Sequence, residues 1–171
     1  MSRISLDYVN GLDQAAFVEQ FGSVFEHSPW VAERAWAARP FASREALHRA
    51  MLEAMHAAPC AEQLALIHAH PDLVGRAAAR RHLTAESQRE QAGAGLDSCT
   101  DAEMAALERY NAAYKEKFGF PFIIAVRASH KQAILTALAQ RLENDRATEF
   151  QRALEEIGKI AGFRLGDLVA E

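Results

Sequence analysis

A disulfide framework, a membrane span and an excess of basic residues are all missing from this 171-residue sequence. Its two cysteines, Cys60 and Cys99, stand alone and show neither a metal-binding spacing nor a disulfide pattern. No apolar run approaches the roughly 18 residues that a membrane helix needs. The net charge is −4 and the pI is near 6.0, which gives no basic footprint for nucleic acid. These absences argue against a disulfide-rich secreted protein, a membrane-spanning protein and a nucleic-acid-binding protein.

Recognisable targeting signals are also missing from the two ends of the sequence. The opening MSRISLDYVNG has no apolar region of the kind that signal peptides carry. The closing Asp-Leu-Val-Ala-Glu is not a peroxisomal address. We therefore expect a reducing, cytoplasmic setting.

Runs of β-branched residues are scarce, whereas alanine, leucine, glutamate and arginine dominate, and this composition favours helices. The length suits one domain with a sizeable core. The sequence predicts an all-α fold: a single compact domain over residues 1–171 with about seven or eight helices. The last helix is expected over roughly 146–169. The candidate helix N-caps are Asp13, Ser28 (before Pro29), Ser43, Thr84, Thr100 (with Glu103) and Ser129 (with Gln132).

The only run with β character is FPFIIAV, at 120–126. One strand cannot form a sheet by itself, so we interpret this run as one short, buried extended segment. Its backbone N–H and C=O groups then need other partners. Such a segment beside Pro121 can also offer N–H groups to a ligand, although core packing is the simpler explanation for its side chains.

His68 and His70 stand two residues apart at the end of a predicted apolar helix, and Pro71 follows directly. Proline disfavours helical backbone angles at the residue before it, so His70 is expected in an extended conformation just beyond the helix. Three interpretations remain open. Both histidines can be partly buried structural residues, they can bind a metal together with His82 and Asp72, or His70 can act in acid–base catalysis.

A second group consists of Ser87, Glu90 and Gln91, which share one face of a predicted helix at spacing i, i+3, i+4. A carboxylate on this face opposite a histidine would make a plausible acid–base pair. Ser-x-x-Glu is equally a capping-box pattern with a purely structural role. Arg127 and Arg164 stand beside apolar residues, so each is expected to be either a buried ion-pair partner or a clamp for an anion.

Several ordered motifs resemble those of the 2-oxo-4-hydroxy-4-carboxy-5-ureidoimidazoline (OHCU) decarboxylases of uric acid breakdown. The resemblance runs almost from end to end. Its motifs are FEHSPWVAERAW (Phe25–Trp36), RPF (Arg39–Phe41), HAHPDLVGR (His68–Arg76), SQREQAGAGL (Ser87–Leu96), YNAAYKEKFGFPFIIAVR (Tyr110–Arg127) and IAGFRL (Ile160–Leu165). Ala128 departs from the family, in which a glycine is expected after the basic residue, but it touches no expected site residue.

The resemblance implies an all-helical homodimer without a metal or an organic cofactor. It also implies a reaction in which OHCU, a small-molecule ureide, loses CO2 to give (S)-allantoin. Carried over by position, the family's catalytic histidine falls on His70 and its carboxylate on Glu90. Further substrate contacts fall on Pro71, Ser87, Gln91 and Arg164, and on the backbone amides of Phe122, Ile123 and Ile124.

The chemistry of OHCU suits these residues. Its hydroxyl and carboxylate share one ring carbon beside an imine-like nitrogen, so the ring itself can delocalise the charge left by CO2. His70 is then the expected acid–base group near neutral pH. Arg164 and the amides are expected to stabilise the anionic part of the substrate. Alternatives are a hydrolase or isomerase acting on a neighbouring ureide, or a non-catalytic helical interaction module.

Overall fold

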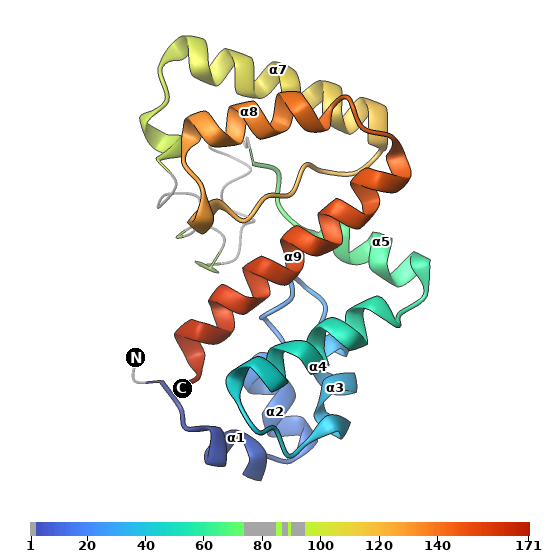
Figure 1. The fold of residues 1–171 in the computed structure, drawn as a ribbon, viewed down its shortest axis with the longest axis vertical. Coiled ribbons are helices and arrows are strands. Elements are labelled where there is room, and N and C mark those ends of the chain that lie inside the picture. The colour runs from blue at the N-terminus through green and yellow to red at the C-terminus, as the bar shows by residue number, and fades with distance from the viewer. Residues whose placement is uncertain (1–2, 74–84, 87–88, 90–94) are drawn as a thin grey trace. The chain divides into compact units, whose positions relative to one another are not determined.

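The structure, a computed structural model, describes residues 3–73, 85–86, 89 and 95–171 (Figure 1). Within these residues every regular element is a helix, and β pairing is confined to an isolated bridge between Ile4 and Val169. The all-α prediction is therefore confirmed. The chain falls into two compact units, unit 1 (Met1–Ala69 with Gly158–Glu171) and unit 2 (His70–Ile157). The single domain expected over 1–171 stays a prediction.

Unit 1 is a bundle of short helices around an apolar core. Phe17, Phe21, Leu47, Met51 and Leu66 are all 1% exposed or less. The helices of unit 1 are α1 (Leu6–Gly11), α2 (Gln14–Phe21), α3 (Trp30–Ala35), the 3₁₀ helix η1 (Trp36–Ala38), α4 (Arg44–His56), α5 (Cys60–Ala69) and the C-terminal part of α9 (Arg146–Leu168).

Side-chain caps begin two of these helices where the sequence predicts them. Asp13 Oδ1 accepts a hydrogen bond from Ala16 N at 2.8 Å, and Ser43 Oγ accepts one from Ala46 N at 3.1 Å. The predicted Ser28 cap is wrong. Helix α3 begins at Trp30 with Pro29 at its N-cap position and no side-chain cap, and the buried Ser28 hydroxyl donates to the Glu26 carbonyl at 2.9 Å.

Unit 2 contains η3 (Leu96–Ser98), α7 (Asp101–Phe118), η4 (Val126–Ala128), α8 (Lys131–Arg141) and the N-terminal part of α9. The capping box of Thr100 and Glu103 is confirmed at the start of α7, which ends at Gly119 with a left-handed φ of 74°. The predicted Ser129 cap is wrong, because His130 Nδ1 accepts from Ala133 N at 3.3 Å and so caps α8.

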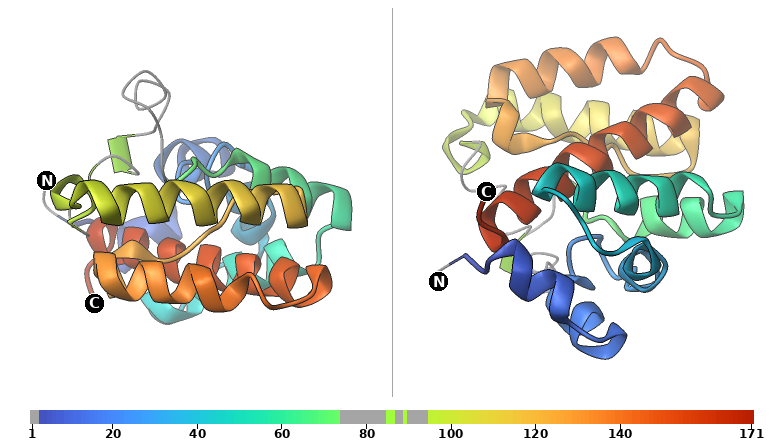
Figure 2. Two further views of the ribbon diagram at one scale, coloured as in Figure 1. Left: turned by 90° about the horizontal axis from the view of Figure 1, so that it is seen from above. Right: turned by 60° about the horizontal axis from the view of Figure 1, so that its bottom comes forward.

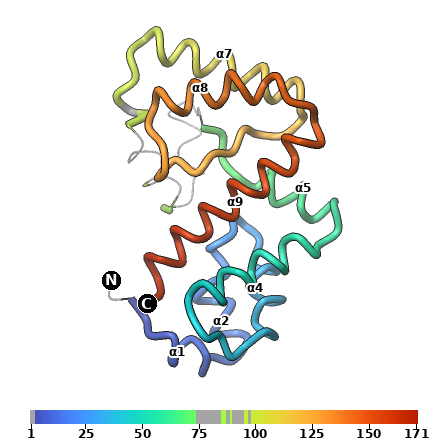
Figure 3. Tube along the Cα trace, viewed as in Figure 1, coloured from blue at the N-terminus to red at the C-terminus, as the bar shows by residue number. Residues whose placement is uncertain are grey.

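An extended segment between α7 and α8 is the other feature that the sequence predicts, and it is confirmed. Helices α7 and α8 lie side by side and run in the same direction, so residues 120–126 must carry the chain back across the unit (Figures 1, 2 and 3). Aromatic side chains pack around this return. Tyr114 and Phe122 meet edge-to-face with ring centroids 5.2 Å apart, and Phe118 stacks on Phe120 at 6.1 Å. The return therefore lies within the core of unit 2.

Helix α9 has the predicted bounds to within one residue at its end. Phe150, Leu154, Ile157 and Ile160 are buried along it, as its apolar periodicity indicates. The predicted cap at Thr84 lies outside the described residues. No helix in the described ranges is both long and apolar enough to cross a membrane.

Candidate active site

His70 directly follows α5 and is the first residue of unit 2. Its side chain is buried, with 7% exposed, whereas His68 is exposed. The chain just beyond His70 is fixed by an ion pair, because Asp72 Oδ2 lies 2.7 Å from Lys115 Nζ on α7. Pro71 and this ion pair both follow His70 in the chain, and together they restrict where His70 can lie. A restricted, buried imidazole suits acid–base chemistry better than an exposed one does.

The backbone of Phe122, Ile123 and Ile124 belongs to the same unit as His70. Phe122 and Ile123 are 1% and 3% exposed, and Ile124 is half-buried. Side chains supply the partners that this extended backbone needs. Arg141 Nη1 donates to the Ile123 carbonyl at 2.6 Å, and the Ala125 N–H donates to Glu156 Oε2 at 2.8 Å.

Arg164 lies on the part of α9 that belongs to unit 1. Its side chain is 4% exposed and forms a buried ion pair, with Nη1 3.2 Å from Glu26 Oε2. The same nitrogen donates to the Val24 carbonyl at 3.2 Å. Of the two roles left open for Arg164, the ion pair is confirmed. Arg127 is exposed, so the buried ion pair considered for it is wrong.

Ser87, Glu90 and Gln91 lie outside the described residues, as does His82. Of the expected site residues, the structure thus brings His70, Pro71 and Phe122–Ile124 into unit 2 and places Arg164 in unit 1. No group of three or more histidine, cysteine, aspartate or glutamate side chains that could hold a metal occurs in the described part of the chain.

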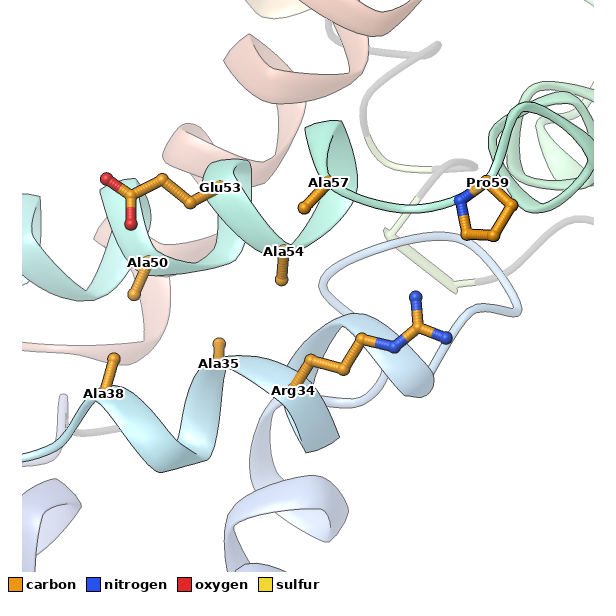
Figure 4. A pocket seen from close by; sticks show the side chains of 8 residues that line it. All are labelled: Arg34, Ala35, Ala38, Ala50, Glu53, Ala54, Ala57 and Pro59. Atoms are coloured by element: carbon orange, nitrogen blue, oxygen red, sulfur yellow. The ribbon is translucent and has the colours of Figure 1, made fainter.

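A groove of about 460 Å³ in unit 1 contains none of the expected site residues (Figure 4). Alanines from α3, η1 and α4 line most of it, together with Arg34, Glu53 and Pro59. Arg34 is already engaged, because it binds both carboxylate oxygens of Glu62, at 2.6 and 3.1 Å. We therefore do not assign chemistry to this groove.

Sequence reasoning missed four buried charged side chains: Glu26 in unit 1, and Arg141, Glu149 and Glu156 in unit 2. Each stands in or beside an apolar stripe of a helix or motif, next to residues such as Phe25, Phe150 and Ile157. That position was the available signal, since a charge on the apolar face of a helix must be paired when it is buried.

Comparisons with known proteins agree with this architecture. The sequence profile of the OHCU decarboxylase family matches residues 10–166. A 2-oxo-4-hydroxy-4-carboxy-5-ureidoimidazoline decarboxylase from Haloferax volcanii is 43% identical, over 98% of this chain and 97% of its own. The uric acid degradation bifunctional protein PucL of Bacillus subtilis is 44% identical, over 98% of this chain and 33% of its own.

A solved structure extends the likeness to three dimensions. The crystal structure of (S)-allantoin synthase superposes with a TM-score of 0.78 and 29% identity, over 98% of this chain. This chain spans 54% of that solved chain, or about half of its length. Fold and matches together define an all-helical decarboxylase. The chain belongs to the OHCU decarboxylase family.

Proposed function

We propose that this protein decarboxylates OHCU to (S)-allantoin in the degradation of uric acid. The observation that carries the proposal is the family match over residues 10–166, together with relatives that align over nearly their whole length. The buried His70, held before Pro71, supports it on chemical grounds.

In this reaction the bond between the ring carbon and its carboxylate breaks, and CO2 leaves. The electron pair of that bond passes into the neighbouring C=N group. The carbon that bore the hydroxyl becomes the carbonyl carbon of allantoin, so the hydroxyl loses its proton, while the ureido-bearing carbon and the nitrogen of the former C=N group each gain one. The reaction of the carboxylate therefore takes up one proton from solvent. The substrate accommodates the electrons itself, and the protein has to orient the carboxylate and move protons.

His70 is the acid–base group in this proposal, because a histidine changes charge near neutral pH. Glu90 orients His70 or accepts hydrogen bonds from the ureido group. Pro71, Ser87 and Gln91 contact the substrate, as they do by family resemblance. All of these roles are proposals, and they require neither a metal nor an organic cofactor.

The anionic part of the substrate is held by Arg164 and by backbone amides of Phe122–Ile124. A guanidinium supplies paired N–H donors that match a carboxylate. Backbone N–H groups fixed in a dry site stabilise the charge that develops as CO2 leaves. We also propose a homodimer located in the cytoplasm.

An assay with freshly generated OHCU tests the proposal. Because OHCU also decays without an enzyme, the rate of the uncatalysed reaction is subtracted, and the product is resolved by circular dichroism. We expect one enantiomer of allantoin, formed faster than in the blank, and activity that survives dialysis against a chelator. A racemic product at the blank rate would overturn the proposal. A different ureide product would indicate a hydrolase or an isomerase.

A further inference from the structure

The extended return between α7 and α8 is held by side chains, since no strand among the described residues pairs with it. Two hydrogen bonds from side chains hold it. Arg141 donates to the Ile123 carbonyl at 2.6 Å, and Glu156 accepts from the Ala125 N–H at 2.8 Å. Ile123 and Ala125 are two residues apart. In an extended chain, residues two apart direct their backbone N–H and C=O groups to the same edge. Arg141 and Glu156 therefore hold one edge of the segment.

The opposite edge carries the backbone groups of Phe122 and Ile124. Among the residues that the structure describes, neither of these N–H groups has a hydrogen-bond partner. Ile124 is only half-buried, so this edge is not sealed by side chains along its whole length. In an extended chain these two nitrogens lie about 6.6 Å apart, so the two N–H groups can each donate to a different oxygen of one anionic ligand.

Arg141 is itself fixed by a buried network on Glu149, a residue with 0% exposure. Glu149 Oε1 accepts from Arg141 Nε at 2.7 Å and from the Tyr114 hydroxyl at 2.6 Å, while Oε2 accepts from Asn144 Nδ2 at 3.0 Å. Burial, and then the hydrogen bond to Glu149, raise the pKa of Tyr114 well above its usual value. Tyr114 therefore stays protonated and donates throughout the physiological pH range.

The guanidinium also fixes the ring beside the carbonyl that it binds. Arg141 Cζ lies 4.4 Å from the centroid of Phe122, whose ring meets Tyr114 edge-to-face. The same Arg141 side chain thus contacts both the ring of Phe122 and the backbone carbonyl of the next residue. The hydrogen bond from the Ala125 N–H to Glu156 is also buried, because Glu156 is only 4% exposed.

Stability alone is a weak reason for such an arrangement. Replacing a buried ion pair by well-packed apolar side chains is often neutral or stabilising. Arg141 also keeps Nη2 buried without a partner among the described residues. Within this costly network, Arg141 contacts both the Ile123 carbonyl and the Phe122 ring, which indicates that the position of this short backbone segment matters.

We propose that Arg141 and Glu156 are positioning residues, which hold residues 122–125 so that the N–H groups of Phe122 and Ile124 each bind a different oxygen of the anionic substrate. This inference rests on the proposed function and deepens it. It assigns the binding to two alternate amides and leaves Ile123 on the opposite, occupied edge. It also gives the network of Arg141, Glu149 and Tyr114 a task in the reaction.

The kinetic test compares two substitutions at one position. Glu156→Gln keeps an oxygen that can accept from Ala125, whereas Glu156→Ala removes the tie. We expect Glu156→Gln to stay close to the wild type and Glu156→Ala to lose roughly 10²-fold in kcat/KM, mostly in kcat. At the other hydrogen bond, Arg141→Lys keeps one charged donor and Arg141→Met keeps none, so the Lys variant should lose less activity than the Met variant. Met51→Ala, a truncation in the core of unit 1, controls for lost stability alone.

A second measurement needs no turnover. With (S)-allantoin as the probe, amide NMR should show shifts and slower hydrogen exchange at Phe122 and Ile124, with little change at Ile123. Equal effects at all three amides, or folded Ala and Met variants that keep wild-type kcat and KM, would overturn the inference. So would an activity loss no larger than that of Met51→Ala at equal stability. An inactive wild type would instead overturn the proposed function, and the NMR experiment would still decide which amides bind.

Discussion

At the scale of single residues, His70 and Arg164 are the two described side chains on which the proposed chemistry depends most. They differ in how they are held. His70 is fixed through its backbone by Pro71, whereas Arg164 is fixed through its side chain by Glu26 and by backbone carbonyls. Substitutions at the two positions should therefore fail in different ways.

His70→Asn should keep the fold and lower kcat by about 10²–10⁴-fold, which is the usual contribution of an acid–base group. Asparagine retains hydrogen bonding but cannot exchange a proton near neutral pH. The measurement is the steady-state rate with OHCU on protein whose thermal unfolding matches the wild type. A folded variant with near-normal kcat would remove His70 from the mechanism.

Glu26→Gln should mainly cost stability. The Arg164 guanidinium would stay buried without the carboxylate 3.2 Å away, and breaking a buried ion pair costs about 3–5 kcal/mol. The double variant Glu26→Gln/Arg164→Met should be less destabilised than the sum of the single variants, because neither charge is then left alone. Urea unfolding measures all three.

The matched control for Glu26→Gln is Glu155→Gln. Its partner Arg152 lies 3.2 Å away, and both side chains are about half exposed. A pair of this kind contributes about 1 kcal/mol at most. Equal losses at the two sites would show that burial does not set the strength of the Glu26–Arg164 pair.

At the scale of elements, the capping box of α7 joins two helices. Glu103 accepts from the Thr100 N–H at 2.8 Å and also from Lys131 Nζ, at the start of α8, at 2.8 Å. The hydrogen bond from Lys131, followed by the one from Thr100, lowers the pKa of Glu103. The same contact raises the pKa of Lys131. The ionised carboxylate thus stabilises the folded state.

The sign of the pH dependence follows from this lowered pKa. Glu103 contributes stability that is fully present above its unfolded pKa of about 4.3 and is lost as the pH falls through its lower, folded pKa. Glu103→Gln should therefore be less stable than the wild type at pH 7, and the difference should close in acid. Thermal unfolding at a series of pH values measures it. A gap that stays constant down to the most acidic point would contradict the prediction.

Local chemistry explains which elements the sequence could predict. Asp13, Ser43 and the capping box of Thr100 and Glu103 depend on neighbours within a few residues, so the sequence pattern was sufficient to predict these caps. The predicted caps at Ser28 and Ser129 were wrong. The Ser28 hydroxyl hydrogen-bonds to the Glu26 carbonyl, and the His130 ring caps α8 in place of Ser129. Contacts between residues that are far apart in sequence, such as Arg164 with Glu26 or Arg141 with Ile123, produce no periodic pattern in the sequence. The family's motifs supplied the expected site residues, but not the buried charges Arg141 and Glu26, which bind the Ile123 carbonyl and Arg164.

At the scale of the whole molecule, a homodimer is expected from the family resemblance. Sedimentation velocity at working concentration should give about twice the chain mass of 18.9 kDa. The Glu156→Ala variant should sediment in the same way if its effect is confined to the site. A wild type that runs only as a monomer would count decisively against the dimer.

Unit 1 is assembled from two pieces of chain that are far apart in sequence, Met1–Ala69 and Gly158–Glu171. Ile4 joins them at their far ends, donating to the Leu168 carbonyl and accepting from the Ala170 N–H, both at 2.9 Å. On the ribosome, the second piece emerges only after all of 70–157, a delay on the order of 10 s at ordinary rates of synthesis. The helices of unit 1 are therefore made first, but the core that they form is completed last. During that interval, their apolar faces are the surfaces that chaperones would meet.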